Sequence, residues 1–337
     1  MNKNIKTSTK DVEKNIKKSN KILNENKKND TILFDGLRGE LLEEISSLHA
    51  IPQTPISIRE NGSSKIYNSN EEIRIVSKKD KNGLDIFIAP NTKNKSVHLP
   101  VIITQSNIHD IVYNDFYIAE NCDILIVAGC GIHTNIGESS HNGVHNFLIG
   151  QNSKVKYIEK HLGLGKEKSK KVLNPTTSVE IKSNSLLEME TVQLGGVSFS
   201  KRITNVKIGE NSKFIVKEKI LTTNNQKAVS YFDIDCEGCN SKTEIVSRSV
   251  AKNNSYQEFN SNVKGKNVCF GRVECDGIVM DNAKICSTPK IDVEDARAEL
   301  SHEAQIGKIA NEQLTKLQTL GLNLEEAENL IISGFLC

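Results

Sequence analysis

Four side chains that can bind a transition metal lie close together in the segment GCGIHTNIGESSHNGVH, residues 129–145. Cys130 supplies a thiol, and His133, His141 and His145 supply imidazoles. Thiolates and imidazoles are common ligands of transition metals. The same imidazoles could instead hydrogen-bond the carbonyl groups of a glycine-rich loop. The segment is therefore a candidate metal site, and a plain loop is the alternative.

A second group of reactive side chains lies near the end of the chain. Cys269, Cys275 and Cys286 are followed by His302 and Glu303. A thiolate can carry a persulfide or bind iron, and an imidazole and a carboxylate can complete a coordination sphere. One chain does not supply four obvious ligands here, which suggests a site completed by another subunit. The alternative is that these cysteines are buried structural residues.

Cys236 and Cys239 form the motif CEGC, whose spacing suits zinc. A structural zinc site normally needs four ligands, and no second CxxC or HxxxH pair lies near this one in the sequence. The redox-active form of CxxC begins a helix, whereas this pair lies between expected strands. We therefore expect a glycine-containing turn at this position.

Motifs for nucleotide hydrolysis and for nucleophilic catalysis are absent from the sequence. The segment GLGKEKS, residues 163–169, lacks the spacing of a phosphate-binding loop. We therefore expect no nucleotide bound to this chain and no enzymatic turnover by it alone. Carbohydrate-active β-helix enzymes need paired carboxylates and usually aromatic platforms, and aromatic residues make up only 5% of the chain. That enzyme class, and a histidine-rich metal-binding interaction protein, remain the alternatives.

The 44 basic and 42 acidic residues leave a net charge of +2, which gives no reason to expect nucleic acid or a membrane surface as a partner. The apolar runs, such as residues 124–128, are far shorter than the roughly 20 residues that span a bilayer. The start MNKNIKTSTK lacks a hydrophobic signal region. We therefore expect a cytoplasmic protein whose cysteines stay reduced.

The chain divides into three expected regions. Residues 1–55 contain a Lys- and Asn-rich arm, expected to be weakly helical, and a short helix or helix pair within residues 31–49. Residues 56–293 contain many short β-branched runs separated by Asn, Gly and Ser, which predicts strands and turns. Residues 294–337 carry helix signals, and we expect the strands to end at Val293.

A regular turn recurs within the β region. An Asn precedes an expected strand at Asn121, Asn152, Asn184, Asn211 and Asn240, with spacings of 31, 32, 27 and 29 residues. Asn tolerates the left-handed backbone conformation of a tight corner. Strands stacked turn upon turn would repeat such a corner at this period, so the pattern predicts a mainly β protein with a parallel β-helix core. An antiparallel β-sandwich is the alternative.

Two short helices are expected at the C-terminal end. The first follows Asn311 and ends at Gly321, and the second has a capping box made by Asn323 and Glu326 and ends at Gly334. This helix pair could seal the last turn of a solenoid or present an apolar surface to a partner. The candidate partner-binding residues are Leu314, Leu317, Leu320, Leu330, Ile331 and Phe335.

The C-terminal run PKIDVEDARAELSHEAQIGKIANEQL, with LGLNLEEAENLIISGF after it, resembles the ending of SufB and SufD proteins. The earlier segments GCGIHT, HNGVH, YIEKH, NPTT and QLGGV are similar to compact members of the same family. Together these motifs cover roughly residues 120–337.

The resemblance implies a right-handed parallel β-helix with helical regions at both ends. It also implies a noncatalytic scaffold of the SUF machinery, which assembles a transient iron-sulfur cluster. The implied partners are a SufC-type ABC ATPase bound at the C-terminal helices, a sulfur donor supplied by a cysteine desulfurase, and a second β-helix subunit.

The resemblance also assigns site residues. The motif ECDG places Cys275 at a position similar to the cluster-assembly cysteine of SufB, and Cys286 is the second choice. The motif SHEA places His302 where SufD has a functional histidine and Glu303 where SufB has a carboxylate near the cluster. Because one chain combines marks of both paralogues, we expect a homodimer with these three residues near a shared interface.

Overall fold

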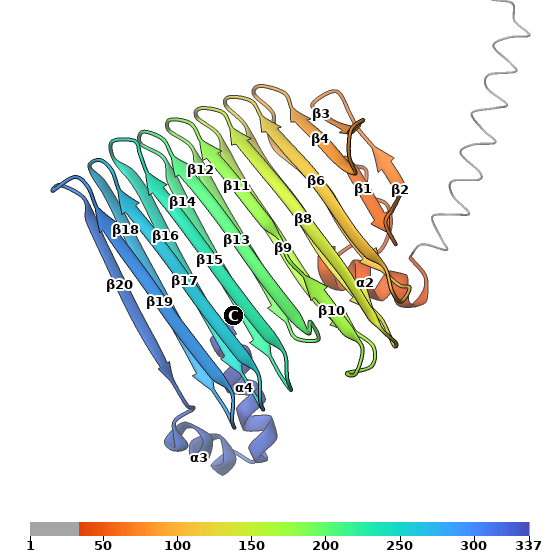
Figure 1. Ribbon diagram of the computed structural model, residues 1–337, viewed down its shortest axis with the longest axis vertical. Helices are drawn as coiled ribbons and strands as arrows, with labels where there is room; N and C mark the ends of the chain where they lie inside the picture. The colour runs from red at the N-terminus through yellow and green to blue at the C-terminus, as the bar shows by residue number, and fades with distance from the viewer. Residues whose placement is uncertain (1–33, 337) are drawn as a thin grey trace, which may run out of the picture.

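The computed structural model describes residues 34–336, and the expected helical arm of residues 1–31 lies outside this range. The described chain is mainly β and forms a β-solenoid of about eight turns, with helices at both ends (Figure 1). The predicted β-helix is therefore confirmed. The sandwich alternative is wrong, because strands from successive turns pair in parallel along nearly the whole length.

Two ten-stranded sheets face each other across the interior. The first sheet, in spatial order, contains β2 (Ser63–Asn68), β1 (Ile56–Glu60), β5 (Lys93–Ile103), β7 (Asp123–His133), β9 (Lys154–Leu164), β12 (Leu186–Leu194), β14 (Lys213–Thr222), β16 (Ser241–Ala251), β18 (Cys269–Val279) and β20 (Glu299–Gly307). The second contains β3 (Ile73–Ser77), β4 (Gly83–Ile88), β6 (His109–Ile118), β8 (Glu138–Ile149), β10 (Lys170–Leu173) with β11 (Thr176–Ile181), β13 (Phe199–Ile208), β15 (Lys227–Cys236), β17 (Tyr256–Gly265) and β19 (Lys284–Val293).

The corners of the solenoid follow from the recurring Asn residues. All five predicted corner residues have a positive φ, between 53° and 58°. The residue after each of the last four is a serine, and these hydroxyls stack from turn to turn: the amide of Ser153 donates to Ser185 Oγ, and the amide of Ser185 donates to Ser212 Oγ, each at 3.0 Å. Repetition of the Asn-Ser pair thus fixes where each turn of the solenoid bends.

Side chains alternate between the interior and the surface along each strand, as the pleat requires. In β9, for example, every second residue from Val155 to His161 is buried. Apolar side chains fill most of the interior, and Phe116 stacks on Phe147 with ring centroids 4.3 Å apart. The position of a residue along its strand, and the turn to which that strand belongs, therefore determine which side chains it can contact in the interior.

The N-terminal helix α2 (Gly36–Ser46) covers the outer face of the first sheet and contacts β5, β7 and β9. The described residues of the expected helical segment form this one helix. Gly129 and Gly131 of β7 allow its close approach. A Cβ at Gly129 would lie 2.8 Å from the carbonyl oxygen of Ile45, and one at Gly131 would lie 2.8 Å from Leu41 Cδ2. The glycines of the GCG motif thus form a docking surface for α2.

The C-terminal region differs from the expectation in two ways. The strands do not end at Val293, because β20 follows and pairs with β18. The helices α3 (Asn311–Thr319) and α4 (Leu324–Leu336) come next, and α4 continues through Gly334. The predicted capping box is confirmed: the Glu326 amide donates to Asn323 Oδ1 at 2.9 Å, and the Asn323 amide donates to Glu326 Oε2 at 2.8 Å.

The helix pair lies beside the last turns of the solenoid (Figure 1), where α4 contacts β16. Ile332 and Leu336 pack against Val250 of β16. Gly334 costs about 1 kcal/mol in a helix, and this apolar packing offsets that cost. No helix in residues 34–336 is long and apolar enough to cross a membrane.

Candidate functional site

Cys275 lies on β18 with its side chain directed into the solenoid, and it is completely buried. Its register partners are Ser247 on β16 and Ala304 on β20. Burial raises the pKa of the Cys275 thiol to about 11, although the nearby Ser287 hydroxyl favours the thiolate. The thiol is therefore neutral at pH 7 in the isolated chain and must be deprotonated before it can bind metal.

His302 lies on β20 and also faces the interior, because its register partner is the buried Val273 of β18. Its Nε2 atom is buried and has no hydrogen-bond partner among the described residues. Burial lowers the pKa of His302, and the charge of Glu303 partly opposes this. Cys275 and His302 thus share one inner face, two positions apart on neighbouring strands.

Glu303 lies on the opposite face of β20 from His302. Its carboxylate accepts a hydrogen bond of 3.0 Å from Arg272, which also binds Glu274. All three of these side chains point outward. The structure therefore brings together two of the three predicted ligands, Cys275 and His302, and places Glu303 on the outer surface of the same strands.

Cys286 lies on β19, in the other sheet, and its side chain is exposed on the outer face. Its sulfur lies 3.9 Å from Thr288 Oγ1. The two candidate cysteines thus occupy opposite environments: Cys275 faces the interior and Cys286 faces the solvent.

The solenoid ends at β19 and β20 without a covering layer from the described residues. Val263 of β17 is 1% exposed, whereas its register partner Ile291 on β19 is 40% exposed. Val293 and Ile306, which also occupy inward positions, are 49% and 38% exposed. Interior positions of the last turn are therefore open, and both final strands have an unpaired edge. We call this surface the open end; Cys275 lies one strand inside it.

The histidine-rich segment lies far from the open end, on β7 and β8. Cys130 and His141 face the interior, and His141 Nδ1 lies 3.1 Å from Asp110 Oδ2. Asp110 also accepts two hydrogen bonds from Arg59, at 2.6 and 2.8 Å. The ion pair of Arg59 and Asp110 thus holds the His141 ring in place.

The other two histidines of this segment have different surroundings. His145 is buried between the rings of Phe116 and Tyr157, and its Nδ1 has no partner within residues 34–336. Burial lowers the pKa of His145 to about 4. His133 is only half-buried, at the end of β7. Across the described chain, no group of three or more His, Cys, Asp or Glu side chains could hold a metal ion, and this includes the surroundings of Cys275.

The structure also contains buried charges that the sequence reading did not identify. Arg202 Nη1 binds Glu159 Oε2 at 2.6 Å, and His161 Nε2 lies 3.3 Å from Glu159 Oε1. Burial alone would raise the pKa of Glu159, but the Arg202 charge and His161 hold it well below its usual range. The sequence did contain a signal for this site: Glu159 is a charged residue at a position where the alternation of side chains along the strand places it in the interior.

Glu218 lies further along the same interior column toward the open end. The column runs through register partners Glu159, Thr191, Glu218, Ser247 and Cys275. Ser230 Oγ donates to Glu218 Oε1 at 2.6 Å, and Ser247 Oγ donates to Glu218 Oε2 at 2.9 Å. Burial raises the pKa of Glu218 despite these bonds. A polar stripe therefore crosses the apolar interior and ends at Cys275.

Two small interior cavities, of about 20 and 10 Å³, accompany this stripe. The first is lined by Cys130, His145 and Glu159, and the second by Arg202 and Glu218, among others. Each has room for about one water molecule. Buried polar groups without a protein partner, such as the Thr191 hydroxyl and Gln193 Nε2, can be satisfied by such waters.

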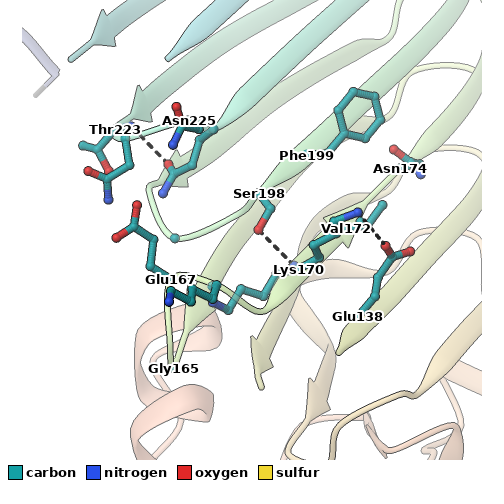
Figure 2. A pocket seen from close by; sticks show the side chains of 16 residues that line it. Glu138, Gly165, Glu167, Lys170, Val172, Asn174, Ser198, Phe199, Thr223 and Asn225 are labelled. Carbon is teal, nitrogen blue, oxygen red and sulfur yellow. Dashed lines mark hydrogen bonds and ion pairs between the residues drawn. The ribbon is translucent and has the colours of Figure 1, made fainter. Parts of the chain in front are cut away.

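A cavity of about 820 Å³ lies at the rim of the solenoid around β10 (Figure 2). Lys170 of β10 lies beside Glu138, its register partner on β8, with 3.9 Å between the charged atoms. The buried Lys171 donates to the carbonyl oxygen of Lys166 at 2.7 Å and so holds the GLGKEKS loop. The described residues that line this cavity include no cysteine or histidine, so they supply no soft metal ligand.

The predicted partner-binding residues divide into two groups. Leu320 and Leu330 are 74% and 54% exposed. Leu314, Ile331 and Phe335 pack partly against the cluster around Val250, and Leu317 is half-buried. The exposed leucines can contact a partner without disturbing the attachment of the helices to the solenoid.

Comparison with known proteins agrees with the resemblance. The family model "SUF system FeS cluster assembly, SufBD core domain" matches residues 109–335. A SufBD family protein of Pyrococcus horikoshii is 29% identical over 289 residues, covering 80% of this chain and 82% of the relative. Another, from Archaeoglobus fulgidus, is 24% identical over 277 residues, covering 80% of this chain and 72% of the relative.

A SufBD family homologue from Methanothermobacter thermautotrophicus is 27% identical over 240 residues, which is 70% of this chain. The match spans 57% of that relative's length. The family model alone covers more than half of the present chain, including β6 to α4 and therefore Cys275, His302 and the open end. The chain belongs to the SufBD family of iron-sulfur cluster assembly proteins.

Proposed function

We propose that this protein is a noncatalytic scaffold on which an iron-sulfur cluster is assembled at the open end of the solenoid. The observation that carries the proposal is the position of Cys275 and His302 on one inner face, one strand inside an end that is not covered. Thiolate and imidazole are both ligands of iron in clusters. The cluster is cargo, and the chain holds it only until transfer.

A second copy of the chain completes the site in this proposal. The exposed inward residues Ile291, Val293 and Ile306 form an apolar surface, and the edges of β19 and β20 can pair with strands of another chain. Two such ends facing each other would bring two copies of Cys275 and His302 together. Replacing Ile291 and Val293 by Asp should therefore give a monomer in analytical ultracentrifugation. A wild-type protein that is monomeric at micromolar concentration would contradict the homodimer.

We further propose that a SufC-type ABC ATPase binds α3 and α4 through Leu320 and Leu330. A chain of contacts connects α4 to the site. Arg248 Nη1 of β16 donates to the carbonyl oxygen of Phe335 in α4 at 3.3 Å, and Arg248 is the register partner of Asp276, the residue after Cys275. ATP-driven movement of the ATPase would pull α4 and open the last turn. Leu320→Ser with Leu330→Ser should weaken ATPase binding without unfolding the chain; unchanged binding would contradict this assignment.

Sulfur would arrive from a donor charged by a cysteine desulfurase, and a neutral buried thiol explains why access must be opened first. The described cysteines are free thiols, which suits the reducing cytoplasm where we place this chemistry. The chain itself would bind no nucleotide, because the ATPase supplies that step.

The scaffold role is tested by cluster transfer. Protein reconstituted with iron and sulfide under anaerobic conditions is mixed with an apo-ferredoxin, and holo-ferredoxin formation is followed by circular dichroism. We expect transfer faster than from free iron and sulfide at the same concentrations, and loss of transfer in Cys275→Ala but not in Cys286→Ala. Transfer no faster than from the free ions would contradict a scaffold.

A further inference from the structure

We propose that the cavity around β10 binds a small molecule through an oxyanion group, a phosphate or a carboxylate, and that the buried ammonium group of Lys171 is the counter-charge. The cavity volume of about 820 Å³ lies within the range of small-molecule sites. This inference goes beyond the proposed function and does not depend on it, because the described residues that line the cavity include none of the predicted cluster ligands.

Three loops stacked at one rim of the solenoid form the cavity. They are residues 165–169, 195–198 and 223–226, which connect β9 to β10, β12 to β13 and β14 to β15. The first two turns are in backbone contact, because a Cβ at Gly196 would overlap the carbonyl oxygen of Gly163. The walls are therefore formed before any ligand binds. A strand follows the first loop, not the helix of a nucleotide-binding phosphate loop, so lysine side chains must supply the positive charge.

Lys171 is a buried cation without a carboxylate partner. Lys171 and Arg202 are the basic residues that the described part of the chain buries, at 3% and 7% exposure. Arg202 is neutralised by Glu159 at 2.6 Å. Lys171 forms no ion pair within residues 34–336, and its Nζ donates instead to the carbonyl oxygens of Lys166 at 2.7 Å and Ser169 at 3.4 Å. A buried charge without a counter-ion is costly, so an anion that reaches Lys171 would be stabilised.

The charges around the cavity also favour an anion. An ammonium group has three N–H donors, and carbonyl oxygens engage two of those on Lys171. Lys168 and Lys170 line the cavity as well, and these three lysines outnumber the two lining glutamates, Glu138 and Glu167. Burial lowers the pKa of Lys171, and the Glu167 charge opposes this. A bound anion would likewise favour the charged amine.

Two side-chain amides on the cavity wall add neutral donors. Asn174 Oδ1 and Gln226 Oε1 each accept a hydrogen bond of 3.1 Å from a backbone amide. Because each oxygen is engaged, each NH₂ group is left as a donor for a ligand. Val172 and Phe199 are half-buried on the wall that Figure 2 shows, and they can contact the apolar part of the ligand. A few directed polar groups beside an apolar wall are typical of a small-molecule site.

The test is isothermal titration calorimetry of the full-length protein in a chloride buffer, with pyrophosphate and citrate as separate probes. We expect wild type to bind at least one of them saturably. Binding of pyrophosphate alone would identify a phosphate ligand, and binding of citrate alone a polycarboxylate. Lys171→Met should weaken binding by about 10- to 100-fold, the loss expected for a hydrogen bond to a charged group. Lys154→Met is the matched control, because it removes the same charge from an exposed position at the opposite end of β9.

Asn225→Trp is a second variant that leaves Lys171 and its hydrogen bonds in place. Asn225 is exposed and lines the cavity from the third loop, so an indole there should fill the cavity and abolish binding. This variant decides the question if circular dichroism shows that Lys171→Met does not fold. The proposal is overturned if wild type binds neither probe, if the affinity is unchanged in Asn225→Trp or in a folded Lys171→Met, or if Lys154→Met loses as much affinity as Lys171→Met.

Discussion

Replacing Arg202 by Met should strongly destabilise the solenoid, because it leaves the Glu159 carboxylate buried without its cation. Both side chains are nearly inaccessible, and the two atoms that bind are 2.6 Å apart. His161 is the remaining neighbour, 3.3 Å from the other carboxylate oxygen, and burial lowers its own pKa. The neutral imidazole compensates the carboxylate charge poorly.

The expected loss is about 3–5 kcal/mol of unfolding free energy, the usual cost of removing one partner of a buried ion pair. Glu159→Gln in the same chain removes the uncompensated charge, so the double variant should be more stable than Arg202→Met alone. Without Arg202, burial dominates and raises the pKa of Glu159 above its unfolded value. The loss should therefore shrink as the pH falls toward that unfolded value and grow as the pH rises.

The assay is urea unfolding followed by far-ultraviolet circular dichroism, with each variant compared with wild type at the same pH. Arg297→Met is the matched control, because Arg297 binds Asp295 at a similar distance of 2.7 Å but on the surface. We expect little change in the control. An Arg202→Met protein as stable as the control, or a double variant less stable than either single one, would refute the reasoning that this charge pair lies in a dry interior.

Three further predictions concern stability. The pKa of His145 is about 4 in the folded chain and 6.5 in the unfolded chain, so its contribution to the unfolding free energy should fall as the pH drops below 6.5, by about 3 kcal/mol at pH 4. His145→Gln should therefore flatten the pH profile of urea unfolding, and an unchanged profile would contradict this. Gly129→Ala should cost about 1–3 kcal/mol by displacing α2, whereas Gly307→Ala, which has open space, should cost nothing; equal effects on the melting temperature would be the contrary result. Asn211→Ala should cost about 1 kcal/mol and Asn211→Gly much less, because φ is 53° there; equal losses in urea unfolding would argue against the corner explanation.

The corners and strands could be predicted because each depends on local chemistry. A left-handed corner favours Asn or Gly, so Asn152 and Asn184 mark the turns at which they lie. The alternation of apolar and polar residues along a strand also predicts which side chains face the interior. The capping box at Asn323 and Glu326 is likewise a local signal.

The strand β20 could not be predicted in the same way. Its sequence ELSHEAQIG contains good helix formers and few β-branched residues. It forms a strand because the edge of β18 offers unsatisfied backbone groups, a tertiary effect that overrides propensity. The face assignment of His302 and Glu303 depends on this strand, so the sequence alone could not separate them.

The pairing of charged side chains in the interior also could not be predicted from the sequence. Arg202 and Glu159 are 43 residues apart, and only the stacking register brings them together. The GCG motif has the composition of a loop, whereas its glycines sit within β7 to admit α2. In both cases the decisive contact lies on another element of the fold.

The central claim is that a cluster forms at Cys275. Its most direct test is anaerobic reconstitution of wild type, Cys275→Ala and Cys286→Ala, followed by visible absorption and quantitation of bound iron and acid-labile sulfide, each with and without the ATPase partner. We predict a cluster in wild type and Cys286→Ala, and its loss in a folded Cys275→Ala. Equal iron and sulfide in Cys275→Ala and wild type would contradict the account.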